Sequence, residues 1–347
     1  MHIPDGYLGP QTYLPALGAM VPLWAWASAK LKKNLRARRV PLVALCSAFC
    51  FVIMMFNVPV PGGTTGHAVG AVLTAVLVGP WAAVVAVSLA LIVQALVFGD
   101  GGITAIGANC LTMAVIMPLA GGWTFRLLSG RARVGSRVRW FAAAAAGYVG
   151  LNAAALATAL LFGIQPAIAR DAAGLPLYCP FGLNVAVPVM MLEHLLLFGF
   201  VEAAVTGFAV AYLDRAEPGL AWAPAPAVAP PQAPSRKLWW VLLALVLLSP
   251  LGLLLPEWLG AGSAWGEWGG EEVSKLIGYV PEGMARLGSL WRAPIPDYSA
   301  PGGVEVPWPL QAAWYLGSAL IGALLLAAVL SVVRWVIART ERHDHAA

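Results

Sequence analysis

The sequence has very little charge for its length. Only 11% of the 347 residues are charged, 60% are hydrophobic, and the mean hydropathy is +0.78. A soluble protein of this size would need many more charged residues to cover its surface, so the composition excludes a soluble globular fold and predicts a membrane protein. Cysteine is also scarce. The four cysteines are too few for a disulfide framework, and we interpret them as small packing residues.

Several motifs are missing as well. The sequence has no Gly-x-x-x-x-Gly-Lys-Ser/Thr stretch, so we expect any ATPase that acts with this chain to be another polypeptide. It has no His-Glu-x-x-His stretch either, which argues against an intramembrane zinc protease. The N-terminus has no basic region and carries Pro4 and Gly6, so no cleavable signal peptide is visible and the first apolar segment is expected to stay in the mature protein. We expect no catalytic residues and no resident cofactor.

Long apolar runs predict an all-α polytopic membrane protein, because a transmembrane helix needs about 20 apolar residues. Nine candidate spans cover residues 11–29, 40–57, 66–79, 81–98, 103–127, 139–163, 184–213, 237–256 and 310–337. The third is short and follows a Gly-rich stretch, so whether it crosses the whole bilayer stays open. A Pro/Ala-rich linker at 216–235 is expected to divide a seven-helix module (1–215) from a two-helix module (236–347) that contains a loop at about 257–308.

The basic residues are distributed unevenly between the two sides of these spans. With nine spans, 17 of the 21 Lys and Arg residues fall on one side and four on the other. The positive-inside rule then places the N-terminus outside the cell, and the linker and the C-terminus in the cytoplasm. The basic balance, a pI near 9.2, is therefore interpreted as a signal of topology in a prokaryotic inner membrane and not of a nucleic-acid partner.

Two of the five histidines fall on the predicted outer side. His2 follows the N-terminus, and His67 opens the third span directly after a Gly-rich stretch. A Met-His start offers three nitrogen ligands in sequence, namely the Met1 amine, the His2 amide and the His2 imidazole. They form fused chelate rings that hold the donors nearly in one plane, and the His67 imidazole supplies a fourth nitrogen. We therefore predict a metal site formed by Met1, His2 and His67.

The chemistry of this donor set limits which metal ions the site is expected to bind. Tetragonal nitrogen coordination suits Ni(II) or Cu(II), and imidazole suits nickel and cobalt in general. Zinc prefers a tetrahedron, which a planar chelate resists. The amine and the amide must each lose a proton before they bind a metal, so binding is expected to weaken in acid.

Three sequence motifs resemble those of the CbiM/NikM family, the substrate-binding S components of energy-coupling-factor transporters for cobalt and nickel. They are Met-His-Ile-Pro-Asp-Gly-Tyr-Leu at 1–8, Pro-Gly-Gly-Thr-Thr-Gly-His at 61–67 and Gly-Gly-Ile-Thr-Ala-Ile-Gly-Ala-Asn at 101–109. The resemblance covers about residues 1–213. The region 237–337 is more loosely similar to the family's two-span CbiN/NikN partner, here fused to the same chain.

The resemblance implies uptake of a divalent metal, Ni²⁺ or Co²⁺, as the transported substrate, with Met1, His2 and His67 as its ligands. It also implies a transmembrane coupling subunit and cytoplasmic ATPase subunits as partners, in contact with membrane lipid. Nickel is favoured. The alternatives are cobalt uptake for cobalamin synthesis by the same mechanism and, more distantly, a membrane metal-dependent enzyme that uses Glu193 and His194.

Other polar residues receive weaker predictions. Five could hydrogen-bond the ligand side chains from a second shell: Asp5, Asn57, Thr64, Thr65 and Asn109. The roles of Glu193, His194 and Glu202, all inside the seventh span, stay open, although ionisable residues in a span are often functional. The acidic residues of the 257–308 loop, Glu267 among them, are expected to be solvated.

Overall fold

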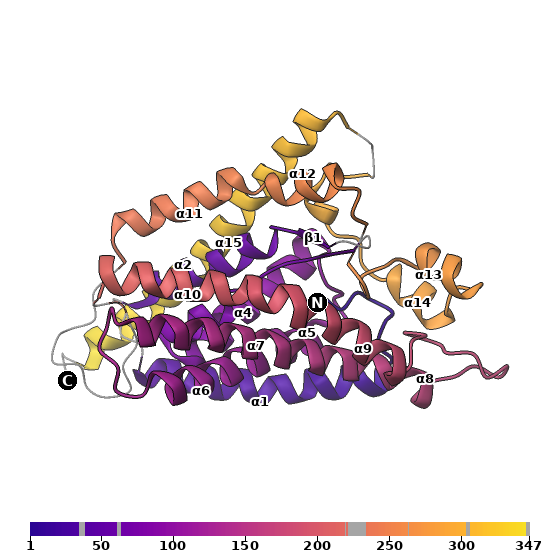
Figure 1. Cartoon of the computed structure of the whole chain (residues 1–347), viewed down its shortest axis with the longest axis horizontal. Helices are drawn as coiled ribbons and strands as arrows, with labels where there is room; N and C mark the ends of the chain where they lie inside the picture. The colour runs from indigo at the N-terminus through magenta and orange to yellow at the C-terminus, as the bar shows by residue number, and fades with distance from the viewer. Residues whose placement is uncertain are drawn as a thin grey trace.

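The structure, a computed structural model, describes residues 1–34, 39–60, 64–218, 220, 234–262, 264–302 and 306–344. Apart from one small hairpin, its regular elements are helices (Figure 1). The α-helices are α1 (Pro10–Asn34), α2 (Val40–Met54), α3 (Ala71–Val78), α4 (Pro80–Val93), α5 (Ile106–Asn109), α6 (Met117–Ser129), α7 (Arg137–Gly163), α8 (Gln165–Ile168), α9 (Leu183–Glu193), α10 (Gly199–Ala216), α11 (Arg236–Leu248), α12 (Leu251–Trp258), α13 (Gly270–Ile277), α14 (Glu282–Gly288) and α15 (Trp308–Asp344).

Six helical stretches of the described chain are long and apolar enough to cross a bilayer. They are 80–98, 106–129, 137–168, 183–216, 236–258 and 308–339. The apolar α2 is shorter, with 15 residues. The prediction of an all-α polytopic membrane protein is therefore confirmed.

The third predicted span, 66–79, contains only a short helix. Helix α3 has eight residues, all of them buried, and ends at Gly79 directly before Pro80. It is preceded by the irregular segment 67–70 and by the antiparallel hairpin of β1 (Val58–Val60) and β2 (Thr64–Gly66), in which Val58 pairs with Gly66. A helix of this length rises about 12 Å, so α3 cannot cross a bilayer and instead lies inside the protein.

Three of the long helical stretches contain a π-helical segment. The segments are η2 (Gln94–Phe98), η3 (Cys110–Ile116) and η4 (His194–Phe198). Such segments are rare and often lie at functional sites. They continue α4, join α5 to α6, and join α9 to α10.

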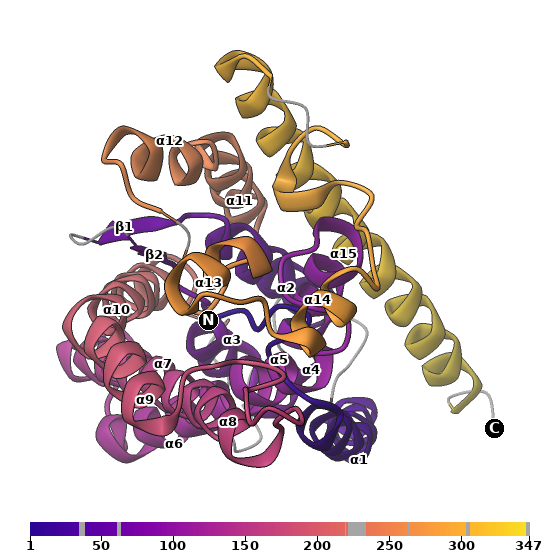
Figure 2. The same ribbon diagram turned by 90° about the vertical axis from the view of Figure 1, so that its right-hand side faces the viewer.

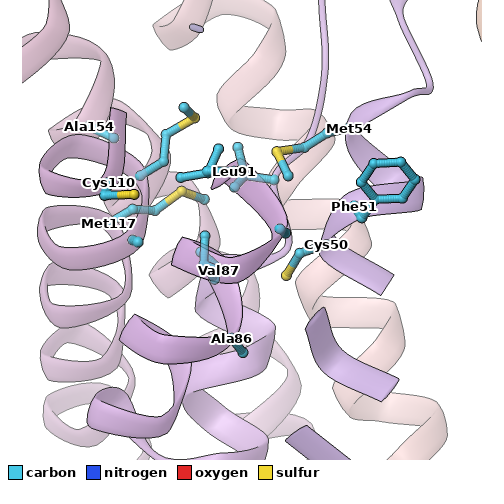
Figure 3. Close-up of a cluster of buried hydrophobic side chains, with 14 of the residues drawn as sticks. Cys50, Phe51, Met54, Ala86, Val87, Leu91, Cys110, Met117 and Ala154 are labelled. Carbon is cyan, nitrogen blue, oxygen red and sulfur yellow. The ribbon is translucent and has the colours of Figure 1, made fainter. Parts of the chain in front are cut away.

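The core lies between the helices that surround α4. Figure 3 shows side chains from α2, α4, η3, α6 and α7 meeting there, with sulfur atoms of Cys50, Met54, Cys110 and Met117 among them. Cys50 and Cys110 are fully buried, which agrees with their interpretation as packing residues. Figure 2 shows the N-terminus near the centre of the bundle, and Figure 1 shows the end of α15 on the far left of the molecule, away from the N-terminus.

The C-terminal helices pack on α2. Tyr315 of α15 donates a hydrogen bond of 2.5 Å to the Met55 carbonyl, and a side chain at Gly322 would overlap the ring of Phe51. The segment that contains α13, α14 and the 3₁₀ helix η5 (Pro296–Tyr298) lies at the same end of the bundle as the N-terminus (Figure 2). Most of the linker predicted at 216–235 lies outside the described residues.

Candidate metal site

The N-terminal segment is buried inside the protein. The exposed fractions of Met1, His2 and Ile3 are 6%, 3% and 0%. Asn109 holds this segment from both sides, because its Oδ1 accepts a hydrogen bond from Ile3 N at 2.8 Å and its Nδ2 donates one to Ile3 O at 3.1 Å. Gly102 N also donates to Ile3 O at 2.8 Å. A chain terminus is usually poorly ordered unless it is tied down, and these bonds tie it down.

Asp5 fixes the next turn of the segment. Its carboxylate accepts hydrogen bonds from Ile103 N at 3.0 Å, from Thr104 N at 2.8 Å and from the Thr104 hydroxyl. A side chain at Gly102 would overlap the backbone of Asp5, so the glycine permits the close approach. The sequence indicated that Asp5 could hydrogen-bond a ligand imidazole, and its described hydrogen bonds go to the backbone of Ile103 and Thr104 and to the Thr104 hydroxyl.

His2 and His67 meet at the centre of the site. His67 Nε2 lies 3.2 Å from His2 Nδ1, and the ring centroids are 4.9 Å apart. His67 follows β2, and its Nδ1 lies 3.1 Å from the carbonyl oxygen of Ala68. A carbonyl can only accept, so Nδ1 carries the proton and the Nε2 lone pair faces His2. His67 thus presents the nitrogen that a metal would use.

Glu267 comes from the loop before α13 and contacts the chain terminus. Its Oε1 accepts a hydrogen bond from the Met1 amine at 2.7 Å and another from His2 N at 2.9 Å. The ligand-type atoms of His2, His67 and Glu267 all lie within 4.8 Å of one another. Sequence reasoning interpreted Glu267 as a solvated loop residue, and that interpretation is wrong.

A second carboxylate borders the site. Asp100 Oδ1 lies 3.0 Å from His2 Nδ1. Its Oδ2 accepts hydrogen bonds from Gln94 Nε2, at 3.2 Å, and from the Tyr298 hydroxyl. Tyr298 has a positive φ of 58°, a conformation that is uncommon outside glycine. The C-terminal region therefore supplies two residues around the cluster, Glu267 and Tyr298.

The pKa values of the site favour neutral imidazoles beside carboxylates. Burial lowers the pKa of His2 to about 4 and that of His67 to about 3. Burial raises the pKa of Asp100 to about 6. Burial by itself would raise the pKa of Glu267, but the positive Met1 amine and the neighbouring imidazoles lower it to about 2. Neutral imidazole is the form that binds a metal, and the anionic carboxylate would attract a cation.

The remaining predicted residues differ in their burial. Thr65 is buried in β2, and Asn57 is half-buried just before β1. The side chain of Thr64 lies outside what the structure describes. His194 is buried, and its Nδ1 lies 2.7 Å from the carbonyl oxygen of Met190 in its own helix, so this ring nitrogen does not face the N-terminal cluster.

Four residues that sequence reasoning did not assign to the site are Gln94, Asp100, Glu267 and Tyr298. Asp100 directly precedes the Gly-Gly motif at 101–102, and Tyr298 ends the Pro-Asp-Tyr stretch at 296–298, so both lie beside motifs that the sequence displays. Glu267 stands among irregularly spaced acidic residues and carries no comparable signal.

The fold and the chemistry of the site define a class, a multi-pass membrane protein with a buried cluster of nitrogen donors of the kind that suits transition metals. The chain belongs to the CbiM family, described as the cobalt uptake substrate-specific transmembrane region, which matches residues 2–220. The chain is 48% identical to the fused nickel transport protein NikMN of Rhodobacter capsulatus, over 99% of each chain. It is 40% identical to the probable fused nickel transport protein LarMN of Lactiplantibacillus plantarum, over 87% of this chain and 90% of that one.

Solved structures resemble about three fifths of the chain. A crystal structure of a transition metal transporter has 52% sequence identity and a TM-score of 0.58, and the match covers 62% of this chain and 93% of that one. A truncated transition metal transporter has 53% identity and a TM-score of 0.57 over 61% of this chain and 98% of that one. The chain is thus a metal transport protein, related to proteins with the same fused organisation.

Proposed function

We propose that this chain captures a divalent transition metal, nickel in preference to cobalt, with four nitrogen donors. These are the Met1 amine, the His2 backbone nitrogen, the His2 imidazole and the His67 imidazole. The observation that carries the proposal is the convergence of these groups. One oxygen of Glu267 is hydrogen-bonded to both Met1 N and His2 N, and the two imidazoles meet at 3.2 Å.

The hydrogen bonds to Glu267 support the proposed position of the ion. Because one oxygen accepts from both backbone nitrogens, these nitrogens face a common point. The His2 imidazole belongs to the same chelate, and His67 faces it from β2. An ion at this point would displace the Glu267 oxygen from the two nitrogens. Tetragonal nitrogen coordination suits nickel, and the relatives with the same fused organisation are named as nickel transport proteins.

The proposal includes an assembly. The chain acts as the substrate-capturing subunit of an ATP-driven energy-coupling-factor transporter, with a coupling subunit and ATPase subunits on other chains. Residues 1–215 form the metal-binding module, and residues 236–347 form a second module whose loop reaches the site through Glu267 and Tyr298. The site faces outward in a prokaryotic inner membrane. The uneven distribution of Lys and Arg supports this orientation.

Nickel binding to the purified full chain tests the site. Calorimetry compares the native chain with His67→Ala and with a chain that carries an extension before Met1. The extension leaves every side chain in place and removes only the free Met1 amine. We expect both changes to abolish high-affinity binding. Normal binding by the extended chain would contradict the proposal.

The matched control uses an extension that a site-specific protease removes to leave Met1 free, since cleavage should restore binding in the same sample. Competition between Ni²⁺ and Co²⁺ in the titration then decides the preferred metal. Stronger binding of cobalt would keep the site and change the substrate.

A further inference from the structure

Helix α10 carries a fully buried carboxylate that the proposed metal chelate does not use. Glu202 has an exposed fraction of 0%. An ionisable side chain in an apolar span is costly and is usually retained for a function. Within the described part of the chain, the partners of Glu202 are N–H and O–H donors.

These donors come from the segment that follows His67. Val69 N donates to Glu202 Oε2 at 2.8 Å, and Gly70 N donates to both carboxylate oxygens at 3.2 Å. Thr206, one turn further along α10, donates its hydroxyl to Oε1 at 3.3 Å. Both oxygens therefore act as acceptors, as an ionised carboxylate does.

The bonds from Val69 and Gly70 lie at the start of α3. Gly70 precedes the helix with φ +73° and ψ 6°, a left-handed conformation that suits glycine. Val69 and Gly70 directly precede Ala71, the first residue of α3, so the carboxylate lies beside the positive end of the helix dipole, which favours a negative charge. Glu202 thus fixes the segment from His67 to Gly70, which leads into α3.

Glu202 is itself held in position by a close contact between α7 and α10. Gly147 of α7 packs against α10 so closely that a Cβ there would lie 2.9 Å from the Glu202 carbonyl oxygen. On the other side of His67, a side chain at Gly66 would overlap the ring of Phe198 in η4. The segment from His67 to Gly70 is therefore held from both sides by residues of the helical stretch 183–216.

We propose that Glu202 is a positioning residue that holds His67 in the metal site through the backbone N–H groups of Val69 and Gly70. The inference rests on the proposed function, because His67 must be a ligand for its position to affect metal binding. Without the carboxylate, the two buried N–H groups lose their acceptor, and the segment from His67 to Gly70 is no longer fixed relative to His2. The N-terminal nitrogens are untouched.

The test compares Glu202→Ala and Glu202→Gln in the full chain with His67→Ala. Calorimetry gives the nickel affinity, and the visible absorption of the bound nickel reports its ligand set. We expect Glu202→Ala to weaken binding about 10–100-fold, as losses of supporting partners do, and to shift the absorption toward that of His67→Ala. Glu202→Gln keeps an acceptor oxygen and should recover part of both.

Thr206→Val is the matched control, because it removes one donor to the carboxylate and leaves the bonds from Val69 and Gly70. It should bind nickel as the native chain does. Thermal unfolding without metal checks that each variant is folded, and Glu202→Gln replaces Glu202→Ala if Glu202→Ala does not fold. If the Glu202 variant used has the native affinity and absorption while His67→Ala is impaired, the inference alone is overturned. Native binding by His67→Ala would instead overturn the proposed site.

Discussion

Two regions of the molecule combine histidine with carboxylates, and they differ in how their polar groups are oriented. In the N-terminal cluster, His2, His67 and Glu267 bring their ligand-type atoms within 4.8 Å of one another. In the helical stretch 183–216, His194 bonds its own helix and Glu202 bonds the backbone of another segment. Side-chain atoms of ligand type that lie close to one another can hold an ion. Glu202 and His194 instead direct their polar atoms toward backbone groups, and such bonds support the structure.

The largest expected effect on nickel affinity distinguishes the N-terminal cluster from the helical stretch 183–216. His2→Ala removes one imidazole from the proposed chelate and should weaken nickel binding more than about 100-fold, beyond the range of supporting residues. His194→Ala removes an equally buried imidazole and should leave the nickel affinity unchanged. Calorimetry on the two purified variants makes the comparison. Impaired binding by His194→Ala would place a ligand in the helical region.

The next effect concerns the residue that holds the terminus in place. Asn109→Ala removes both side-chain hydrogen bonds to Ile3 and should weaken nickel binding about 10-fold or more through misplacement of Met1 and His2. Asn152→Ala in α7 is the matched control, since the Asn152 side chain donates to the Tyr148 carbonyl of its own helix. Equal affinities in the two variants would show that the terminus does not depend on Asn109.

The charge of Glu267 should have a comparable effect. Glu267→Gln keeps an acceptor for the Met1 amine but removes the negative charge. The carboxylate attracts both the ammonium and the incoming dication, and the Coulomb energy with the dication is twice as large at equal distance. We therefore expect binding about 10-fold weaker, a loss of about 1.4 kcal/mol. Glu272→Gln, in the first turn of α13, is the control. Tighter binding by Glu267→Gln would show that its bond to the amine opposes metal capture.

The smallest expected effect tests the outer border of the cluster. Tyr298→Phe removes the hydroxyl that contacts Asp100 and Gln94. The change should weaken nickel binding only about 3-fold, about 0.7 kcal/mol, because the hydroxyl supports Asp100 and does not touch the chelate. Tyr315→Phe removes a hydroxyl bonded to Met55 and should not change the affinity. A loss as large as that of His2→Ala would make Tyr298 part of the chelate.

Local patterns in the sequence were enough to identify part of this protein. Long apolar runs predicted the helical membrane fold, because the bilayer requires about 20 apolar residues for each span. The N-terminal nitrogens were also visible in the sequence, because the amine, amide and imidazole of a Met-His start are covalently adjacent. The short, Gly-preceded third span left open whether it crosses the bilayer, and the hairpin before it and its burial as a short helix did not follow from hydrophobicity.

The sequence by itself therefore determined the membrane class and predicted Met1, His2 and His67 as the donor residues. The tertiary structure alone decided which carboxylates surround and support them. Glu267 lies 265 residues from His2 in the chain, and Glu202 lies 133 residues from Val69. The partner of a carboxylate is whichever donor lies within hydrogen-bonding distance after folding, and neither its type nor its spacing in the sequence specifies that donor.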